Sequence, residues 1–187
     1  NKKYYLNIMT KKIDLIVKNG SYVTHKETIK GDIAVHKGKI YRVGNIFDLK
    51  ASKTIDARGL HILPGAIDTQ VHFREPGNTD KEDLKSGSRA AVAGGITTVF
   101  DMPNNNPSMS TKTLFKKKLN GAKNRMFCNY AFYFGAEKNN TAEIKKMEKE
   151  VGCCGIKVFV GVSTGTLIVS DYKDIKRIMK STKKMIS

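Results

Sequence analysis

The sequence predicts an α/β fold in which a small β-sandwich segment precedes a series of strand–helix units. Residues 13–65 show short β-branched runs and turn signals without helical periodicity, whereas residues 66–187 alternate strand-like and helix-like runs. Four strand–helix units in series predict a parallel sheet, either doubly wound or closed as a barrel. A complete eight-unit barrel needs about 250 residues, so as a barrel residues 66–187 would supply only half.

The segment before residue 66 is predicted to consist of strands and tight turns, after a tail at residues 1–12. Asn19-Gly20 is a turn signal that follows the first apolar run. Lys37-Gly38 between two apolar runs predicts a hairpin, because glycine readily takes a positive φ. The strands are expected at 13–17, 32–36, 39–43 and 54–57.

From residue 66 the expected strands and helices alternate. Ser110 and Thr141 are expected helix caps, because their hydroxyl groups can accept hydrogen bonds from backbone N–H groups. Strands are predicted at 67–72, 97–100, 129–134 and 155–160, and helices at 81–94, 111–123, from 141 onwards, and at 171–183. Residues 185–187 are expected to begin a fifth strand. The residues expected to face inward from the last two helices are Ile144, Met147 and Val151, then Tyr172, Ile175, Ile178 and Met179.

Composition excludes several classes of protein. The 187 residues are 40% hydrophobic and 27% charged, which is typical of a globular chain. No run of about 18 apolar residues is present, so no membrane-spanning helix is expected. The three cysteines, Cys128, Cys153 and Cys154, are odd in number and lack the spacing of a zinc site or a disulfide framework. They favour a reducing, cytoplasmic setting.

The net charge of +17 is spread along the chain. A nucleic-acid-binding protein would gather its basic residues in one groove with aromatic residues between them. Here the basic residues fall mostly on the polar faces of expected helices, including the cluster at 116–118. We therefore expect general attraction for anions and no nucleic-acid partner.

Residues 65–77 contain the strongest functional signal. Asp68, Gln70, His72 and Arg74 occupy every second position, so they would share one face of a strand. Four polar groups on a buried strand are costly unless they bind something. The alternative is a surface strand with one solvated face.

The carboxyl ends of the other predicted strands add further polar groups. In both architectures ligands gather at these ends. The second strand is followed by Asn104, Asn105 and Asn106, and the fourth carries Lys157 in an otherwise apolar run. A lysine there would extend to the strand end, pair, lose its proton or be modified. The guanidinium of Arg74 and the amide groups suit a ligand with carboxylate and amide groups.

These motifs resemble the dihydroorotase branch of the cyclic amidohydrolases, close to hydantoinases and allantoinases. The resemblance covers residues 13–187 and depends on five segments in the same order. They are Leu63-Pro64-Gly65-Ala66-Ile67-Asp68, Val71-His72-Phe73-Arg74-Glu75-Pro76-Gly77, Ala93-Gly94-Gly95-Ile96-Thr97-Thr98, Met102-Pro103-Asn104-Asn105-Asn106-Pro107 and Gly155-Ile156-Lys157-Val158-Phe159. It implies the first half of a (β/α)₈ barrel preceded by part of a β-sandwich.

The resemblance also implies an activity and a site. The family interconverts dihydroorotate and N-carbamoyl-L-aspartate in pyrimidine synthesis, using two zinc ions that activate a hydroxide. By resemblance, His72 and Lys157 match metal ligands, the lysine being carbamylated in many members. Arg74 and Asn104 match the groups that hold the substrate carboxylate.

Two departures from the family pattern accompany the resemblance. Gln70 stands where the family has the first histidine of a metal-binding pair, and a glutamine amide is a poor zinc ligand. The family's remaining histidines and its catalytic aspartate are expected beyond Ser187, and an original start before Asn1 or at Met9 remains open. We therefore expect this chain alone to be inactive, and aggregation-prone or homo-oligomeric. The alternative is a non-catalytic scaffold for a partner such as aspartate transcarbamoylase.

Overall fold

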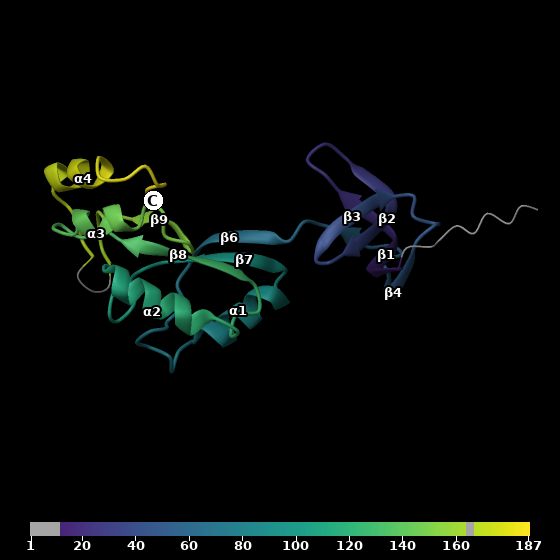
Figure 1. Ribbon diagram of the computed structural model, residues 1–187, viewed down its shortest axis with the longest axis horizontal. Coiled ribbons are helices and arrows are strands. Elements are labelled where there is room, and N and C mark those ends of the chain that lie inside the picture. Colours follow the sequence, from purple (N-terminus) through teal and green to yellow (C-terminus); the bar gives the residue numbers. More distant parts are fainter. Residues whose placement is uncertain (1–11, 164–166) are drawn as a thin grey trace, which may run out of the picture. The chain divides into compact units, whose positions relative to one another are not determined.

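The structure is a computed structural model that describes residues 12–163 and 167–187 (Figure 1). The chain divides into two compact units, with the boundary between Pro64 and Gly65. The predicted tail at 1–12 lies outside the described residues, except for Lys12.

The first unit contains one mixed five-stranded sheet, in the order β3-β2-β1-β4 with β5 paired to β1. The strands are β1 (Lys12–Val23), β2 (Thr28–His36), β3 (Lys39–Gly44), β4 (Lys50–Asp56) and β5 (His61–Ile62). The central strand β1 pairs antiparallel with β2 and parallel with β4. A small buried core covers this sheet, formed by Ile13, Ile16, Ala34, Ile46 and Leu49.

Two turn predictions in this unit had different outcomes. The hairpin at Lys37-Gly38 is confirmed, since both residues take a positive φ and connect β2 to β3. The turn predicted at Asn19-Gly20 is wrong, because β1 continues through it with a shift of register. Asn19 takes a φ of 63° there, and its backbone N–H donates to the Asp32 carboxylate. The positive φ therefore belongs to a bulge in a continuous strand and not to a chain reversal.

The second unit is a curled parallel sheet with helices, which is half of a barrel and confirms the predicted fold class. Its strands are β6 (Ala66–Val71), β7 (Ile96–Asp101), β8 (Asn129–Gly135) and β9 (Cys153–Lys157), adjacent in that order. The helices between and after them are α1 (Leu84–Ala93), α2 (Lys112–Ala122), α3 (Thr141–Lys146) and α4 (Tyr172–Met179). Figure 1 shows α1 and α2 packed along one side of the sheet. Three fully buried phenylalanines, Phe115, Phe132 and Phe134, lie in the core of this unit.

The last residues continue the parallel order of the sheet. The backbone N–H of Ile156 donates to the carbonyl of Met185, and the N–H of Ser187 donates to the carbonyl of Ile156, both at 2.9 Å. Ile186 forms a parallel bridge with Ile156 of β9. The predicted beginning of a fifth strand is confirmed.

Several details of the helices differ from the predictions. Thr111, not Ser110, caps α2, and its hydroxyl accepts the backbone N–H of Leu114. Asn140, not Thr141, precedes α3. The third helix is shorter than predicted, because α3 ends at Lys146 and Val151 lies beyond it. Side chains predicted inward that are exposed are Val151 (83%), Tyr172 (75%) and Met179 (58%).

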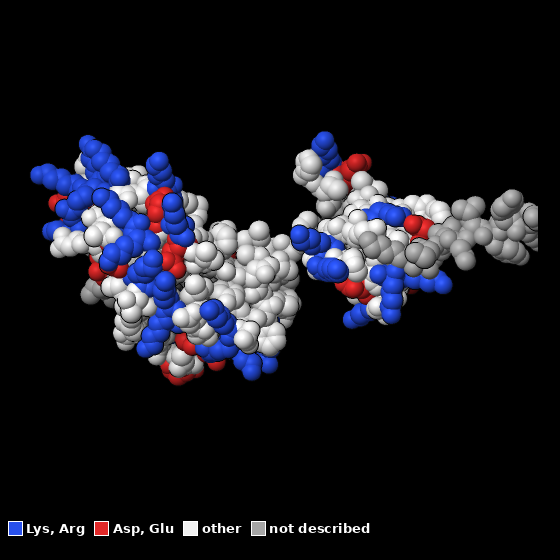
Figure 2. Space-filling model, in the orientation of Figure 1, with Lys and Arg blue, Asp and Glu red and all other residues white. Residues whose placement is uncertain are grey.

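Lysine and arginine side chains are distributed over both units. Figure 2 shows them on the visible face of both units, with aspartate and glutamate side chains among them and a broad area without charged side chains on the second unit. Within the described part of the chain, no helix has the length and apolar character needed to cross a bilayer.

Candidate functional site

The candidate site lies where β6 and β7 end. Strand pairing stops at Val71 opposite Asp101, so His72 and Arg74 follow β6 in a loop instead of extending it as predicted. The strict alternation of polar residues therefore covers only Asp68 and Gln70. Gln70 is exposed, and its backbone N–H donates to the Asp68 carboxylate at 3.0 Å.

The structure brings His72 and Asn104 together. Nδ1 of His72 lies 2.9 Å from Oδ1 of Asn104, and both side chains are half-buried. An amide oxygen can only accept a hydrogen bond, so Nδ1 carries the hydrogen in this arrangement. A hydrogen bond from Nδ1 leaves Nε2 directed away from Asn104, which is how a metal-binding histidine is oriented by its second nitrogen.

Arg74 and Lys157 lie at two different strand ends. Arg74 is exposed to solvent in the loop after β6. Lys157 is the last residue of β9 and is half-buried, with its ammonium 5.2 Å from the centre of the Phe159 ring. The lysine therefore makes a cation–π contact at the end of the strand. Thr164, Gly165 and Thr166, in the loop after β9, lie outside the described residues.

A buried polar network beneath this loop was missed by the sequence analysis. Lys118, assigned to a solvated lysine cluster, has a side chain only 1% exposed and donates to Asp101 Oδ2 at 2.6 Å. The same ammonium donates to Oδ1 of Asn105 at 2.6 Å and lies 4.8 Å from the centre of the Phe132 ring. The sequence does contain an indication of this burial. Lys118 lies three residues after the buried Phe115 in α2, and residues three apart share one face of a helix.

Burial acts on both charges of this pair. Removal from water raises the pKa of Asp101 and lowers the pKa of Lys118, because it disfavours each ionised form. Their mutual attraction and hydrogen bonds oppose both shifts. A pair of this kind is costly to break, because either charge left alone would be buried without a partner.

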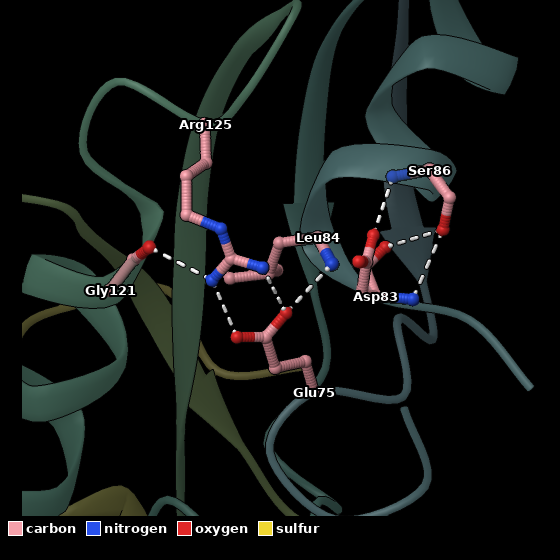
Figure 3. A network of polar contacts seen from close by, with 6 residues as sticks. All are labelled: Glu75, Asp83, Leu84, Ser86, Gly121 and Arg125. Atoms are coloured by element: carbon pink, nitrogen blue, oxygen red, sulfur yellow. Dashed lines mark hydrogen bonds and ion pairs between the residues drawn. The ribbon is translucent and has the colours of Figure 1, made fainter. Parts of the chain in front are cut away.

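A second ion pair fixes the start of the loop that leads to α1. Both oxygens of the Glu75 carboxylate accept hydrogen bonds from the Arg125 guanidinium, at 2.6 and 2.8 Å (Figure 3). The same carboxylate accepts the backbone N–H of Leu84, the first residue of α1. At the next residue back, Asp83 caps α1 through the N–H of Ser86 (Figure 3). The Arg125 guanidinium holds the pKa of Glu75 below its usual value.

Replacing Glu75 by glutamine should lower the free energy of unfolding by about 1–2 kcal/mol at neutral pH. Because the pKa of Glu75 is lowered in the folded state, its contribution is complete above its unfolded pKa of about 4.3 and is lost as the pH falls through the folded value. Denaturant unfolding from pH 3 to 7 should therefore show a gap between wild type and Glu75→Gln that closes in acid. Glu82→Gln is the control, and an equal, pH-independent loss in both variants would contradict this assignment.

The described residues do not by themselves fit a zinc centre. His72 offers one imidazole nitrogen, and the ammonium of Lys157 is no ligand unless it is modified. Nowhere in residues 12–163 and 167–187 do three or more His, Cys, Asp or Glu side chains gather closely enough to hold a metal ion. Structural zinc takes four ligands and catalytic zinc three from the protein. Burial raises the pKa of the Cys154 thiol to about 12.

Solved structures define the fold class to which this chain belongs. The L-hydantoinase (dihydropyrimidinase) from Arthrobacter aurescens superposes with a TM-score of 0.81 at 30% identity, over 89% of this chain and 37% of that protein. A D-hydantoinase from Thermus sp. superposes with a TM-score of 0.73 at 24% identity, which supports the fold alone. The second unit is therefore the first half of a hydantoinase-like barrel.

Sequence comparison gives the family. An allantoinase from Salmonella choleraesuis is 36% identical over 163 residues, which are 87% of this chain and 36% of that protein. A dihydroorotase from Aquifex aeolicus is 39% identical over 147 residues, 75% of this chain and 35% of that protein. The model of the amidohydrolase family matches residues 61–184. The chain belongs to the amidohydrolase family, and it spans about a third of the length of these relatives.

Proposed function

We propose that this chain forms the first part of the site of a dihydroorotase-like cyclic amide hydrolase. The reaction is the interconversion of dihydroorotate and N-carbamoyl-L-aspartate by hydrolysis of the ring amide. The observation that carries the proposal is the 2.9 Å contact between His72 and Asn104, which joins the loops after β6 and β7. Membership of a family of cyclic amidases supports the reaction class.

Each site residue has a proposed role. His72 and Lys157 are proposed as the contributions of this chain to a zinc site, with Lys157 carbamylated, and further ligands would have to come from outside the described residues. Arg74 and Asn104 are proposed to hold the substrate carboxylate. A guanidinium can donate two parallel N–H groups to a carboxylate, and the exposed position of Arg74 leaves it accessible to a ligand. We place the intact enzyme in pyrimidine synthesis and in the cytoplasm.

The carboxylate role selects among the cyclic amides. Dihydroorotate carries a carboxylate beside its ring, whereas allantoin and hydantoin do not. An exposed guanidinium gains a charged pair of hydrogen bonds only from a ligand that carries a carboxylate. Arg74 therefore favours dihydroorotate.

Dihydroorotate should bind the chain with a dissociation constant on the order of 1 mM, because the chain spans only about a third of the length of its relatives. Dihydrouracil, the same ring without the carboxylate, should bind at least about tenfold more weakly. Arg74→Gln should weaken dihydroorotate to the same extent, whereas Arg89→Gln, a change at an exposed arginine of α1, should not. Chemical-shift titration measures the four affinities, those of the wild-type chain for both ligands and those of the two variants for dihydroorotate. Equal binding of the two ligands, or an unchanged Arg74→Gln titration, would refute the carboxylate role.

The isolated chain should neither retain stoichiometric zinc nor hydrolyse dihydroorotate. One imidazole and one lysine leave a zinc ion short of protein ligands. Metal analysis after dialysis and a hydrolysis assay with added zinc test this expectation. Turnover that disappears with a chelator would overturn it.

The exposed Gln70 favours one alternative, a non-catalytic relative that supports a partner such as aspartate transcarbamoylase. A side chain that does not bind zinc at the position of a family histidine is expected in a scaffold. In a full-length version of the protein, the variant Gln70→His separates the two functions, with Gln70→Asn as control. A gain of zinc affinity only in Gln70→His favours the enzyme, and no change in metal content favours the scaffold.

A further inference from the structure

We propose that Lys118 is a positioning residue that holds the loop carrying His72 and Arg74 in place from beneath the site. The ammonium group links the residue that ends β7 to the loop that follows it, through Asp101 and Asn105. The proposal rests on the proposed function only in naming the ligand.

The network holds the backbone of one residue, Phe73, through both its N–H and its carbonyl group. Of the two carboxylate oxygens of Asp101, Oδ1 accepts the backbone N–H of Phe73 at 2.9 Å. Nδ2 of Asn105 donates to the backbone carbonyl of the same Phe73, also at 2.9 Å. The Lys118 ammonium donates to Oδ2 of Asp101 and to Oδ1 of Asn105, both at 2.6 Å. Both side chains are thereby oriented toward Phe73 by one cation.

Phe73 lies between two of the proposed site residues. His72 precedes it and Arg74 follows it, so fixing the peptide groups on both sides of Phe73 limits the directions of both side chains. Phe73 is 6% exposed, and its ring packs so closely on Gly87 of α1 that a Cβ added to Gly87 would lie 2.6 Å from Cε1 of Phe73. Ring and backbone are therefore both held.

The network also fixes the partner of His72. Asn104 is the neighbour of Asn105, so the lysine holds both the loop that carries the imidazole and the loop that carries its amide acceptor. Sites hold productive geometry when buried hydrogen bonds lock the supporting residues. In this half barrel the support comes from α2 on the outer layer, not from the rim itself.

The test is the variant Lys118→Met, which keeps the length of the side chain and removes its donors. Lys117→Met, a change at the exposed neighbour, is the matched control. Amide exchange of Phe73 should become at least about tenfold faster relative to that of Ala136, whose N–H donates to Lys157 across β8 and β9. The nitrogen resonances of the His72 ring should report loss of the single Nδ1–H tautomer. Lys117→Met should leave both unchanged.

Asn105→Ala removes only one contact to Phe73 and leaves the buried ion pair. It is therefore the variant that tests the proposal in case Lys118→Met does not fold. It should accelerate Phe73 exchange and change the His72 signals, with Ala136 unaffected. Equal acceleration of all amides, or unchanged His72 signals in whichever variant folds, would show a merely structural network and overturn the proposal. Dihydroorotate affinity should fall about tenfold in parallel. If wild type binds no dihydroorotate, the proposed function fails while the Phe73 and His72 measurements still decide this proposal.

Discussion

Asp101→Ala should lower the free energy of unfolding of the second unit by about 3–5 kcal/mol, because it leaves the Lys118 ammonium buried without its counter-ion. The carboxylate is 0% exposed, and it also accepts the backbone N–H of Phe73. Denaturant unfolding measures the loss. Asp80→Ala, a change at an exposed aspartate of the same unit, should stay within about 0.5 kcal/mol.

A double variant separates the charge effect from the hydrogen bond. Asp101→Ala combined with Lys118→Met removes both charges, so the loss should shrink to about 1–3 kcal/mol, the cost of leaving the Phe73 N–H without an acceptor. A double variant as unstable as the sum of the single variants would show that the two side chains act independently. A loss below about 1 kcal/mol in Asp101→Ala would contradict the buried pair itself.

The barrel half was predictable because its pattern is periodic and repeated. Strands β6 to β9 alternate with helices α1 to α4 along the chain, and parallel pairing follows from this alternation. Where the prediction failed, a single residue decided the local structure. Asn19 took a positive φ inside a strand, because the Asp32 and Asp56 carboxylates accept its N–H groups across the sheet.

The sequence predicted where the candidate residues lie only at the strand ends, and their roles stay predictions. His72, Arg74 and Asn104 follow strands directly, so the rule that ligands gather at strand ends selected them. Asp101 ends β7 as well, yet its carboxylate is directed to Lys118 beneath the loop instead of outward to a ligand. Sequence spacing assigns a residue to an end of the sheet, but which side of the loop it faces depends on the packing of α2.

Lys118 was missed because a charge run favours a solvated helix face. In Lys116, Lys117 and Lys118 the three charges are alike in sequence, but a helix turns about 100° per residue, so one of them faces the core. That one meets a carboxylate, an amide and a ring, which together stabilise a buried ammonium. Without knowledge of these partners, a buried lysine would be predicted to cost free energy, so the sequence favoured an exposed one.

Phe132→Ala should lower the free energy of unfolding of the second unit by about 3–5 kcal/mol. The ring is fully buried, and its centre lies 6.4 Å from that of Phe115 and 5.6 Å from that of Tyr130. Truncation removes these contacts and leaves a cavity beside the Lys118 ammonium. Phe127→Ala, at a ring 54% exposed, should cost about 1 kcal/mol or less.

A leucine at the same position separates the effect of lost apolar volume from the effect of the lost contact between the ring and the Lys118 ammonium. Phe132→Leu keeps much of the apolar volume but removes the ring beneath the ammonium, a contact worth about 2 kcal/mol where water is excluded. Combined with Lys118→Met, the leucine variant should lose less than the sum of the two single changes, because the cation–π contact can be lost only once. Strict additivity, measured by denaturant unfolding of the four proteins, would show that Phe132 supports the core without stabilising the lysine on which the loop of His72 depends.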